Sequence, residues 1–243
     1  MNMFIFNPND ATVKHPSIIR GKPLSLSARR KTAKPAPPET GLRERGKARK
    51  LAAIRRAARE LFIEKGYDQA TTRAIARRAG VALGTLFIYA ADKRDLLFLI
   101  FNDELEEVAA KGFAEAPGNV AFPDQLVGIF RAFYIFFARQ PELARFMLRE
   151  LTFYVEGREA RRFQEHREKI IANLASLVER AKKDGRIRFD EDSGVAARAI
   201  WAIYSAEIRR WLGGANKAPD LSGGLADLRR VFGLLIAGFK PRA

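Results

Sequence analysis

The 243-residue sequence contains no cysteine, which excludes disulfide bonds and thiolate metal ligands. It has two histidines, and no Ser-His pair or metal-ligand cluster can be assembled around them from the spacing. A glycine-rich phosphate loop after a strand is also absent. These absences argue against an enzyme, and they give no reason to expect a cofactor or a metal ion.

Long apolar runs are absent as well, since none approaches the roughly 18 residues of a membrane span. The apolar stretch at residues 1–6 is short and lacks the basic start of a signal peptide. The cytoplasm is therefore the expected location, and no membrane partner is expected from this feature.

Acidic side chains are outnumbered by basic ones: 28 Asp and Glu stand against 44 Lys and Arg, for a formal net charge of +16. Residues 1–50 alone hold 12 basic and 3 acidic side chains. A basic excess gathered at one end favours nucleic acid or another anionic surface as partner. Charge alone is compatible with double-stranded DNA and with an anionic membrane surface.

The stretch from Thr71 to Lys93 argues for DNA, because its pattern predicts a helix-turn-helix. Thr71 is the expected N-cap of a short first helix, and Gly80 lies just past its end, where a positive φ is required. Leu86 is the clearest core residue of a second helix of about two turns. Two such helices joined by a Gly-containing turn are typical of the motif whose second helix reads the major groove.

Side chains away from the apolar faces of these helices are the candidates for DNA contacts. Arg73 and Arg77 lie four residues apart, where both can reach phosphates. Thr85 and Tyr89, also four apart, are expected to face the groove, and Lys93 is expected to hold a phosphate.

At these residues the sequence resembles the DNA-binding domain of the tetracycline-repressor (TetR) family of transcription regulators. The resemblance covers about residues 47–107, with the motif at about 70–89. The matching positions are Thr71, Ile75-Ala76, Ala79-Gly80-Val81, Gly84-Thr85-Leu86-Phe87, Tyr89, Lys93 and Leu96. The resemblance implies a DNA-binding surface made of Thr71, Arg73, Arg77, Leu83, Gly84, Thr85, Phe87, Tyr89 and Lys93.

Four positions depart from the family pattern, and one of them is Ala90, which stands where an aromatic residue follows Tyr89 in the family. Ala82 stands where a Ser commonly caps the recognition helix, and Leu83 stands where a Lys or Arg is frequent. Phe87 replaces the family's phosphate-binding Tyr and lacks its hydroxyl. An apolar residue at the groove can touch a thymine methyl but cannot pair with guanine, so these departures bear on the operator sequence.

Residues 1–45 are expected to form a disordered basic tail, because six prolines interrupt it and no apolar period appears. Three interpretations stay open: an arm that contacts phosphates or the minor groove, a solvated tail, or a start codon assigned too early. From Gly46 to Gly66 the sequence predicts a strong amphipathic helix with basic residues in its first half.

Residues 108–243 predict a helical body, so the expected fold class is all-α, with an N-terminal three-helix DNA-binding domain and a C-terminal helical domain. Aromatic residues recur in the body at helical spacing: Phe130, Phe133, Tyr134, Phe137, Phe146, Tyr154, Phe163, Trp201 and Tyr204. Such residues form either an ordinary core or an apolar ligand cavity. The family resemblance implies a cavity, because its members commonly sense small molecules there.

The last two predicted helices, at about 195–212 and 222–239, carry apolar stripes that are wide for helices packing on a single neighbour. A second copy of the chain would cover them in a four-helix bundle, whereas the alternative is that both stripes close the monomer core. The expected function is a ligand-responsive repressor that binds a palindromic operator in double-stranded DNA as a homodimer. The alternative is a constitutive or architectural DNA-binding protein without a small-molecule effector.

Overall fold

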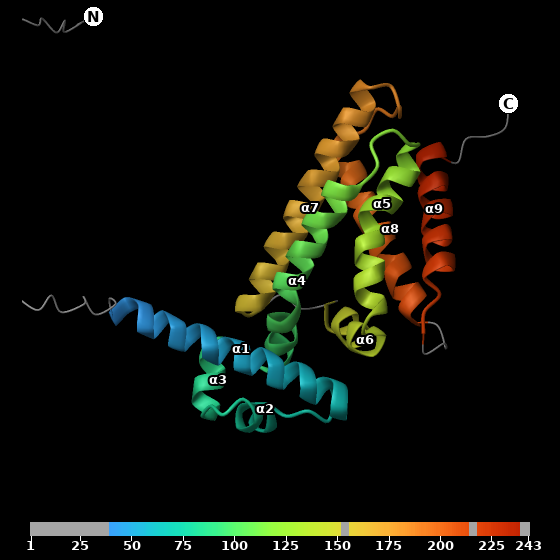
Figure 1. Cartoon of the computed structure of the whole chain (residues 1–243). Helices are drawn as coiled ribbons and strands as arrows, with labels where there is room; N and C mark the ends of the chain where they lie inside the picture. Colours follow the sequence, from blue (N-terminus) through green and yellow to red (C-terminus); the bar gives the residue numbers. More distant parts are fainter. Residues whose placement is uncertain (1–38, 152–155, 214–217, 239–243) are drawn as a thin grey trace, which may run out of the picture. The chain divides into compact units, whose positions relative to one another are not determined.

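The computed structural model describes residues 39–151, 156–213 and 218–238, and within these ranges every regular element is a helix (Figure 1). The expected all-α class is confirmed. The helices are α1 (Glu39–Lys65), α2 (Thr72–Arg78), α3 (Leu83–Tyr89), α4 (Lys93–Glu115), α5 (Phe122–Ala138), α6 (Pro141–Glu150), α7 (Arg158–Lys183), α8 (Ser193–Gly213) and α9 (Leu221–Ala237). Each helix among these residues is too short or too polar to cross a lipid bilayer.

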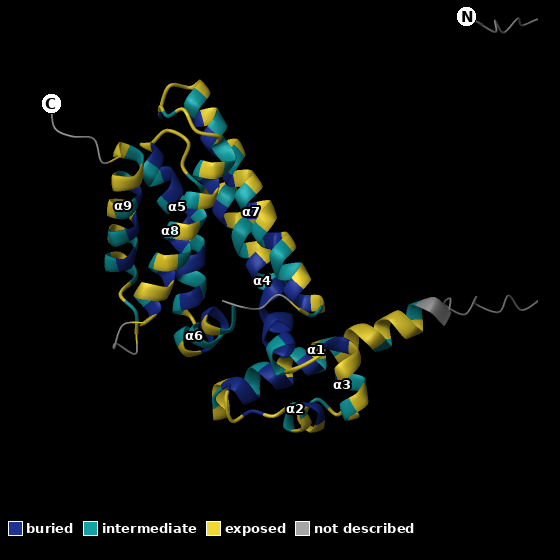
Figure 2. Cartoon of the chain, turned by 180° about the vertical axis from the view of Figure 1, so that it is seen from behind, coloured by how far each residue is buried: buried dark blue, intermediate teal, exposed yellow. Residues whose placement is uncertain are grey.

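Helix α1 begins at Glu39, seven residues before the predicted start at Gly46. The assignment of residues 39–45 to a disordered tail is therefore wrong. This segment contains no proline and is rich in Arg and Glu, which favour a helix enough to tolerate single glycines. Its first turns are largely exposed, as Figure 2 shows. Residues 1–38, the rest of the predicted tail, lie outside the described residues.

Helices α1, α2 and α3 and the start of α4 pack against one another and share a group of buried apolar residues. Ile54 of α1, Ile75 of α2, Leu86 of α3 and Leu96 of α4 each have an exposed fraction of zero. Each of the short helices buries its apolar face here, and neither is long enough to be stable alone. These helices, with the start of α4, are called the head below.

Helix α4 continues from the head into the body, where it packs against α5 and α7 (Figure 1). It ends at Glu115. Gly112 permits the close approach of α5, because a Cβ atom there would lie 2.4 Å from the carbonyl oxygen of Ile129. The proposed boundary between residues 107 and 108 falls inside this helix, so the division into 47–107 and 108–243 stays a prediction.

The remaining helices build the body around the aromatic residues of α5. The Phe130 ring stacks on Tyr204 of α8 with centroids 4.1 Å apart and lies 5.7 Å from Phe232 of α9. Helix α9 begins at Leu221, one residue before the predicted start at about 222, and its N-cap residue is Asp220. The sequence pattern placed this helix correctly and missed its start by one residue, within the usual uncertainty of helix ends.

A buried polar cluster fixes the start of α7 on α4. The Asn102 side-chain amide donates to the Glu159 carbonyl oxygen at 3.0 Å and to its carboxylate at 2.8 Å. The Asp95 carboxylate accepts from the Glu159 backbone N–H at 3.1 Å. All three residues are at most 3% exposed. Buried polar groups are retained at low cost only when they are hydrogen-bonded, so these contacts set the position of α7.

We predict that Asn102→Ala lowers the free energy of unfolding by about 2–3 kcal/mol, because it leaves the buried Glu159 carboxylate without its amide donor. Urea denaturation followed by circular dichroism measures this change. Asn173→Ala, at an exposed position of α7, is the matched control and should change stability by less than about 0.5 kcal/mol. Equal stability of the two variants would show that the Asn102–Glu159 contact does not fix α7.

Candidate nucleic-acid interface and ligand cavity

The two short helices of the head have the cap and turn that the sequence predicts. The Thr71 hydroxyl accepts a hydrogen bond from the Ala74 backbone N–H at 3.1 Å, which caps α2. Gly80 has φ of +66°, the left-handed conformation expected just after this helix. Ala82 is the N-cap residue of α3, and its side chain makes no capping hydrogen bond. The turn therefore holds α3 through backbone geometry and core packing.

All three arginines on α2 are exposed, and among the described residues only Arg78 has an acidic partner. Arg73 and Arg77 are exposed, as expected of residues that contact phosphates. Arg78, next in sequence, donates instead to the Glu64 carboxylate of α1 at 2.6 Å. This hydrogen bond lowers the pKa of Glu64 and raises that of Arg78. Arg78 thus braces α2 against α1, while Arg73 and Arg77 present their charge outward.

The outward face of α3 is apolar. Gly84 is exposed, as are Phe87 and Ile88, with exposed fractions of 45% and 66%, whereas Thr85 and Leu83 are half-buried. Ile88 was missed from the sequence, although it lies four residues after Gly84 and three after Thr85 and so shares their face. Large apolar side chains at these levels of exposure are suited to contacts with thymine methyl groups.

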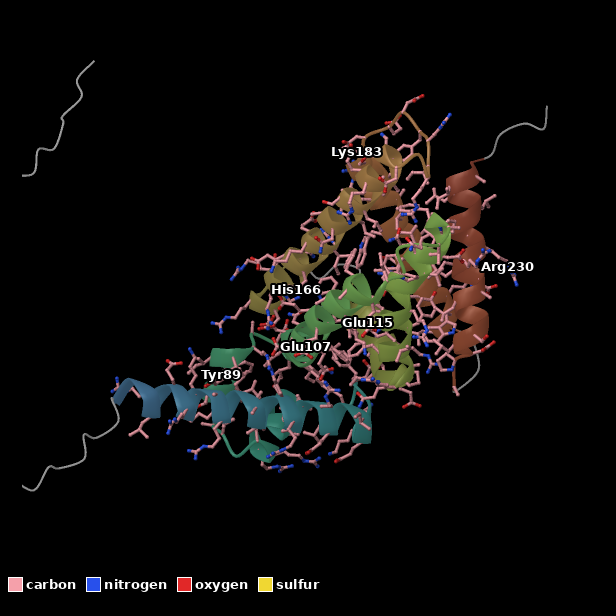
Figure 3. All side chains as sticks on the ribbon, turned by 45° about the horizontal axis from the view of Figure 1, so that its top comes forward. Tyr89, Glu107, Glu115, His166, Lys183 and Arg230 are labelled. Atoms are coloured by element: carbon pink, nitrogen blue, oxygen red, sulfur yellow. The ribbon has the colours of Figure 1, made fainter. Side chains whose placement is uncertain are left out.

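Tyr89 does not face the groove, and the expectation that it does is wrong. Its exposed fraction is 8%, and its hydroxyl donates to the Lys47 carbonyl oxygen of α1 at 3.3 Å. Figure 3 places its label beside α1. A helix as short as α3 needs two anchors to bury one side, and Leu86 and Tyr89, three residues apart, provide them. Tyr89 therefore positions the recognition helix.

Lys93, expected to hold a phosphate, has its ammonium directed at the head itself. Its Nζ donates to the carbonyl oxygens of Tyr67 and Asp68 at 2.9 and 3.1 Å and lies 4.6 Å from the centroid of the Tyr67 ring. These contacts fix the connection between α1 and α2 at the start of α4. Phosphate binding by Lys93 stays a prediction.

Helix α1 adds a basic surface beside the motif. Lys47, Arg49, Lys50 and Arg56 are exposed, as are Arg43 and Arg45 in the turns that the sequence assigned to the tail. Arg55 is half-buried instead and forms an ion pair with Asp103 of α4. The exposed residues extend the positive charge of the head along α1, which suits contacts with a phosphate backbone.

A cavity of about 600 Å³ lies in the body, with α4, α5, α6, α7 and α8 contributing to its wall. Five of the nine predicted pocket residues line it: Phe133, Phe137, Phe163, Trp201 and Tyr204. Met147, Leu148, Ile170 and Ile208 complete much of its apolar wall. A cavity of this size, mostly apolar, is typical of small-molecule sites.

The other predicted pocket residues lie elsewhere. Phe130 is in the core behind Tyr204, and Tyr134 is fully buried with its ring centroid 4.6 Å from that of Trp211. Phe146 packs against Tyr67 of the head, with centroids 5.7 Å apart. Placing Phe130, Tyr134 and Phe146 in the cavity was wrong, because helical spacing does not distinguish a residue at a cavity from one in the core. Tyr154 lies outside the described residues.

The charged residues of the cavity lining are two arginines. The polar part of the lining comprises Gln164, His166, Arg167, Ser205 and Arg209. Arg209 is exposed and Arg167 half-buried, which puts positive charge at the outer part of the cavity. His166 is 8% exposed, and burial lowers its pKa below the ordinary value, so the imidazole is neutral near pH 7.

Ionic contacts run from the cavity wall to the head. The His166 Nε2 atom is 3.2 Å from a Glu106 carboxylate oxygen on α4, and that oxygen is 3.7 Å from Arg162. Arg162 also pairs with Asp103, whose other oxygen pairs with Arg55 of α1. Burial opposes ionisation of Asp103, but hydrogen bonds from Arg162 and Arg55 outweigh burial and lower its pKa. The three helices α7, α4 and α1 are thereby joined.

A second set of contacts joins the head to α6. Arg149 donates to the Asp68 carboxylate at 2.9 Å, and Arg94 donates to the Glu150 carboxylate at 3.0 Å. Arg149 and Asp68 are exposed, so this pair is weak on its own, but α6 also contributes Met147 and Leu148 to the cavity.

No cluster of three or more potential metal ligands occurs among the described residues.

Comparison with known proteins finds a family model that matches the head and a relative that is similar over most of the chain. Residues 54–100 match the family model for bacterial regulatory proteins of the tetR family. The HTH-type transcriptional repressor Rv1474c of Mycobacterium tuberculosis is 29% identical over 188 residues, which cover 73% of this chain and 91% of that protein.

Two solved structures extend the likeness of fold to the body. FadR of Thermus thermophilus, a TetR-family transcriptional repressor solved with lauroyl-CoA, has a TM-score of 0.60 and 24% identity, with 79% of this chain and 96% of that one covered. FadR of Bacillus subtilis, solved with stearoyl-CoA, has a TM-score of 0.61 and 21% identity, with 78% and 99% covered. Residues 54–100 thus match the DNA-binding domain of the tetracycline-repressor (TetR) family, and the chain as a whole is similar to transcriptional repressors in sequence and in fold.

Proposed function

We propose that this chain is a ligand-responsive repressor that binds a palindromic operator as a homodimer. The observation that carries this proposal is that α4 links the head, with its exposed face on α3, to a body with an apolar cavity of about 600 Å³. An architectural DNA-binding protein has no use for such a cavity, so the alternative without an effector is not favoured. A relative that is a transcriptional repressor supports repression, rather than activation, of transcription by this chain.

The DNA contacts divide into two kinds. Arg73 and Arg77 on α2, with the exposed basic residues of α1, contact phosphates and set the position of the head. Thr85, Phe87 and Ile88 on α3, with Gly84 allowing close approach, face the bases of the major groove. Because two of these three side chains are apolar, we expect the half-site to present thymine methyl groups to them.

The homodimer is proposed to form through α8 and α9, at about residues 195–212 and 222–239. The exposed large apolar side chains on these helices are Val195, Leu234 and Leu235. Leu228 and Phe232 of α9, by contrast, are fully buried in the monomer core. The interface therefore uses the outer faces of the two helices, and charge introduced at Phe232 would unfold the chain before it separated a dimer.

The proposed effector has an apolar chain and an anionic head group, the chemistry of a long-chain acyl-CoA. The apolar wall of Phe133, Phe163 and Trp201 fits the chain, and the outlying Arg167 and Arg209 fit the anionic group. Two relatives of the same fold were solved with lauroyl-CoA and stearoyl-CoA. Binding in the body would favour a head spacing that does not match two half-sites about one helical turn apart.

We predict that Arg73→Ala and Arg77→Ala each weaken binding to every DNA sequence and reduce the slope of log affinity against log salt by about 1. The operator is first identified by sequencing DNA retained by the purified protein from a random pool. Fluorescence anisotropy at several salt concentrations then measures each variant.

Arg78→Ala is the matched control, since it removes an arginine of the same helix that is paired with Glu64. Its salt slope should equal that of the wild type. A slope lowered by Arg78→Ala and unchanged by Arg73→Ala and Arg77→Ala would contradict this assignment of the phosphate contacts.

We further predict that Ser205→Phe fills part of the cavity and yields a repressor that no longer responds to effector. Lauroyl-CoA should release the operator from the wild type in an anisotropy assay, whereas the variant should bind the operator with unchanged affinity and retain it. Ser176→Phe, at an exposed position of α7, is the control and should respond as the wild type does. Release from Ser205→Phe at wild-type concentrations of lauroyl-CoA would show that the cavity is not the effector site.

A further inference from the structure

One polar group in the cavity wall has no partner. The lining residue His166 is 8% exposed, and its Nδ1 atom is buried without any hydrogen bond. Its neighbours on the same face of α7, Phe163 and Ile170, are apolar, as is Leu105 of α4. A buried acceptor or donor left unpaired in such surroundings is costly, and it is found where a ligand or water supplies the missing partner.

The opposite edge of the imidazole is already engaged. Nε2 lies 3.2 Å from the Glu106 carboxylate, which also has Arg162 and Lys169 within 3.7 Å. Glu106 is about half exposed and does not line the cavity. A carboxylate oxygen accepts hydrogen bonds, so we assign the imidazole proton to Nε2, the ring nitrogen that faces it.

With the proton on Nε2, Nδ1 of a neutral imidazole is an acceptor only. We propose that His166 is a recognition residue for the effector, whose Nδ1 accepts a hydrogen bond from a neutral O–H or N–H group on an otherwise apolar chain. This inference rests on the proposed function and narrows it. The effector carries a hydrogen-bond donor beside its apolar part, either a chain hydroxyl, as in a 3-hydroxyacyl group, or an amide N–H, as in the pantetheine arm of coenzyme A.

A buried acceptor flanked by the apolar side chains of Phe163 and Ile170 discriminates between ligands. A ligand that buries Nδ1 without donating to it leaves the desolvated atom unpaired, and a ligand that presents a carboxylate there meets a second acceptor. The same ring begins the ionic series from Glu106 through Arg162 and Asp103 to Arg55 of the head. A ligand bound at His166 therefore contacts the end of that series directly.

Two probes and one substitution test the proposal. His166→Gln keeps a side-chain N–H for Glu106 and removes the Nδ1 acceptor. Isothermal titration calorimetry with lauroyl-CoA and 3-hydroxylauroyl-CoA should show about tenfold weaker binding of at least one probe to the variant. Loss with both probes assigns the amide N–H as donor, and loss with the hydroxylated probe alone assigns the hydroxyl. The matched control is His15→Gln, which changes the chain's other histidine and should bind both probes as the wild type does.

A spectroscopic measurement on the wild type is independent of how the variant folds. With two histidines in the chain, 15N-histidine labelling gives two imidazole signal sets, and His15→Gln identifies that of His166. Saturating probe should shift the Nδ1 signal of His166 and leave Nε2 protonated. An unchanged Nδ1 signal, or wild-type affinity of His166→Gln for both probes, would overturn this inference and leave the proposed function standing. Failure of both probes to bind the wild type would overturn the two together.

Discussion

The described structure depends on α4 being one uninterrupted helix that packs within the head at its start and within the body farther along. Leu96 closes the core of the head, and Leu105, farther along the same helix, lines the cavity of the body. A packed core does not deform gradually, so a displacement of α4 at the cavity has to reappear at the head. Asp103 of α4 pairs with Arg55 of α1 and with Arg162 of α7. These ion pairs hold α1 and α7 against α4 between the head and the cavity.

Features that depend on residues close together in the sequence could be predicted from it. The cap at Thr71 and the positive φ at Gly80 depend on residues within one or two turns, and both are confirmed. The all-α class and the TetR-type motif follow from periodicity and from positions that agree in register. The start of α1 was misjudged because Gly46 was given more weight than the helix-forming residues before it.

Contacts between residues distant in sequence could not be predicted. Tyr89 turns inward because of a carbonyl group 42 residues earlier in the chain, and Arg55 turns toward α4 because of Asp103. Phe146 packs on the head while Phe163 lines the cavity, although both lie on helical stripes of the same kind. Periodicity identifies the buried face of a helix, but which neighbour covers that face is decided by tertiary packing.

The central claim is that operator and effector favour different separations of two heads in one dimer. Because the chain lacks cysteine, Ile63→Cys on the exposed side of α1 provides one spin-label site per subunit. Pulsed electron–electron double resonance measures the distance between the two spin labels, first with operator DNA bound and then with lauroyl-CoA bound. The account predicts one narrow inter-subunit distance on the operator and a different distance with lauroyl-CoA. Absence of any inter-subunit distance, or the same distribution under both conditions, would contradict it.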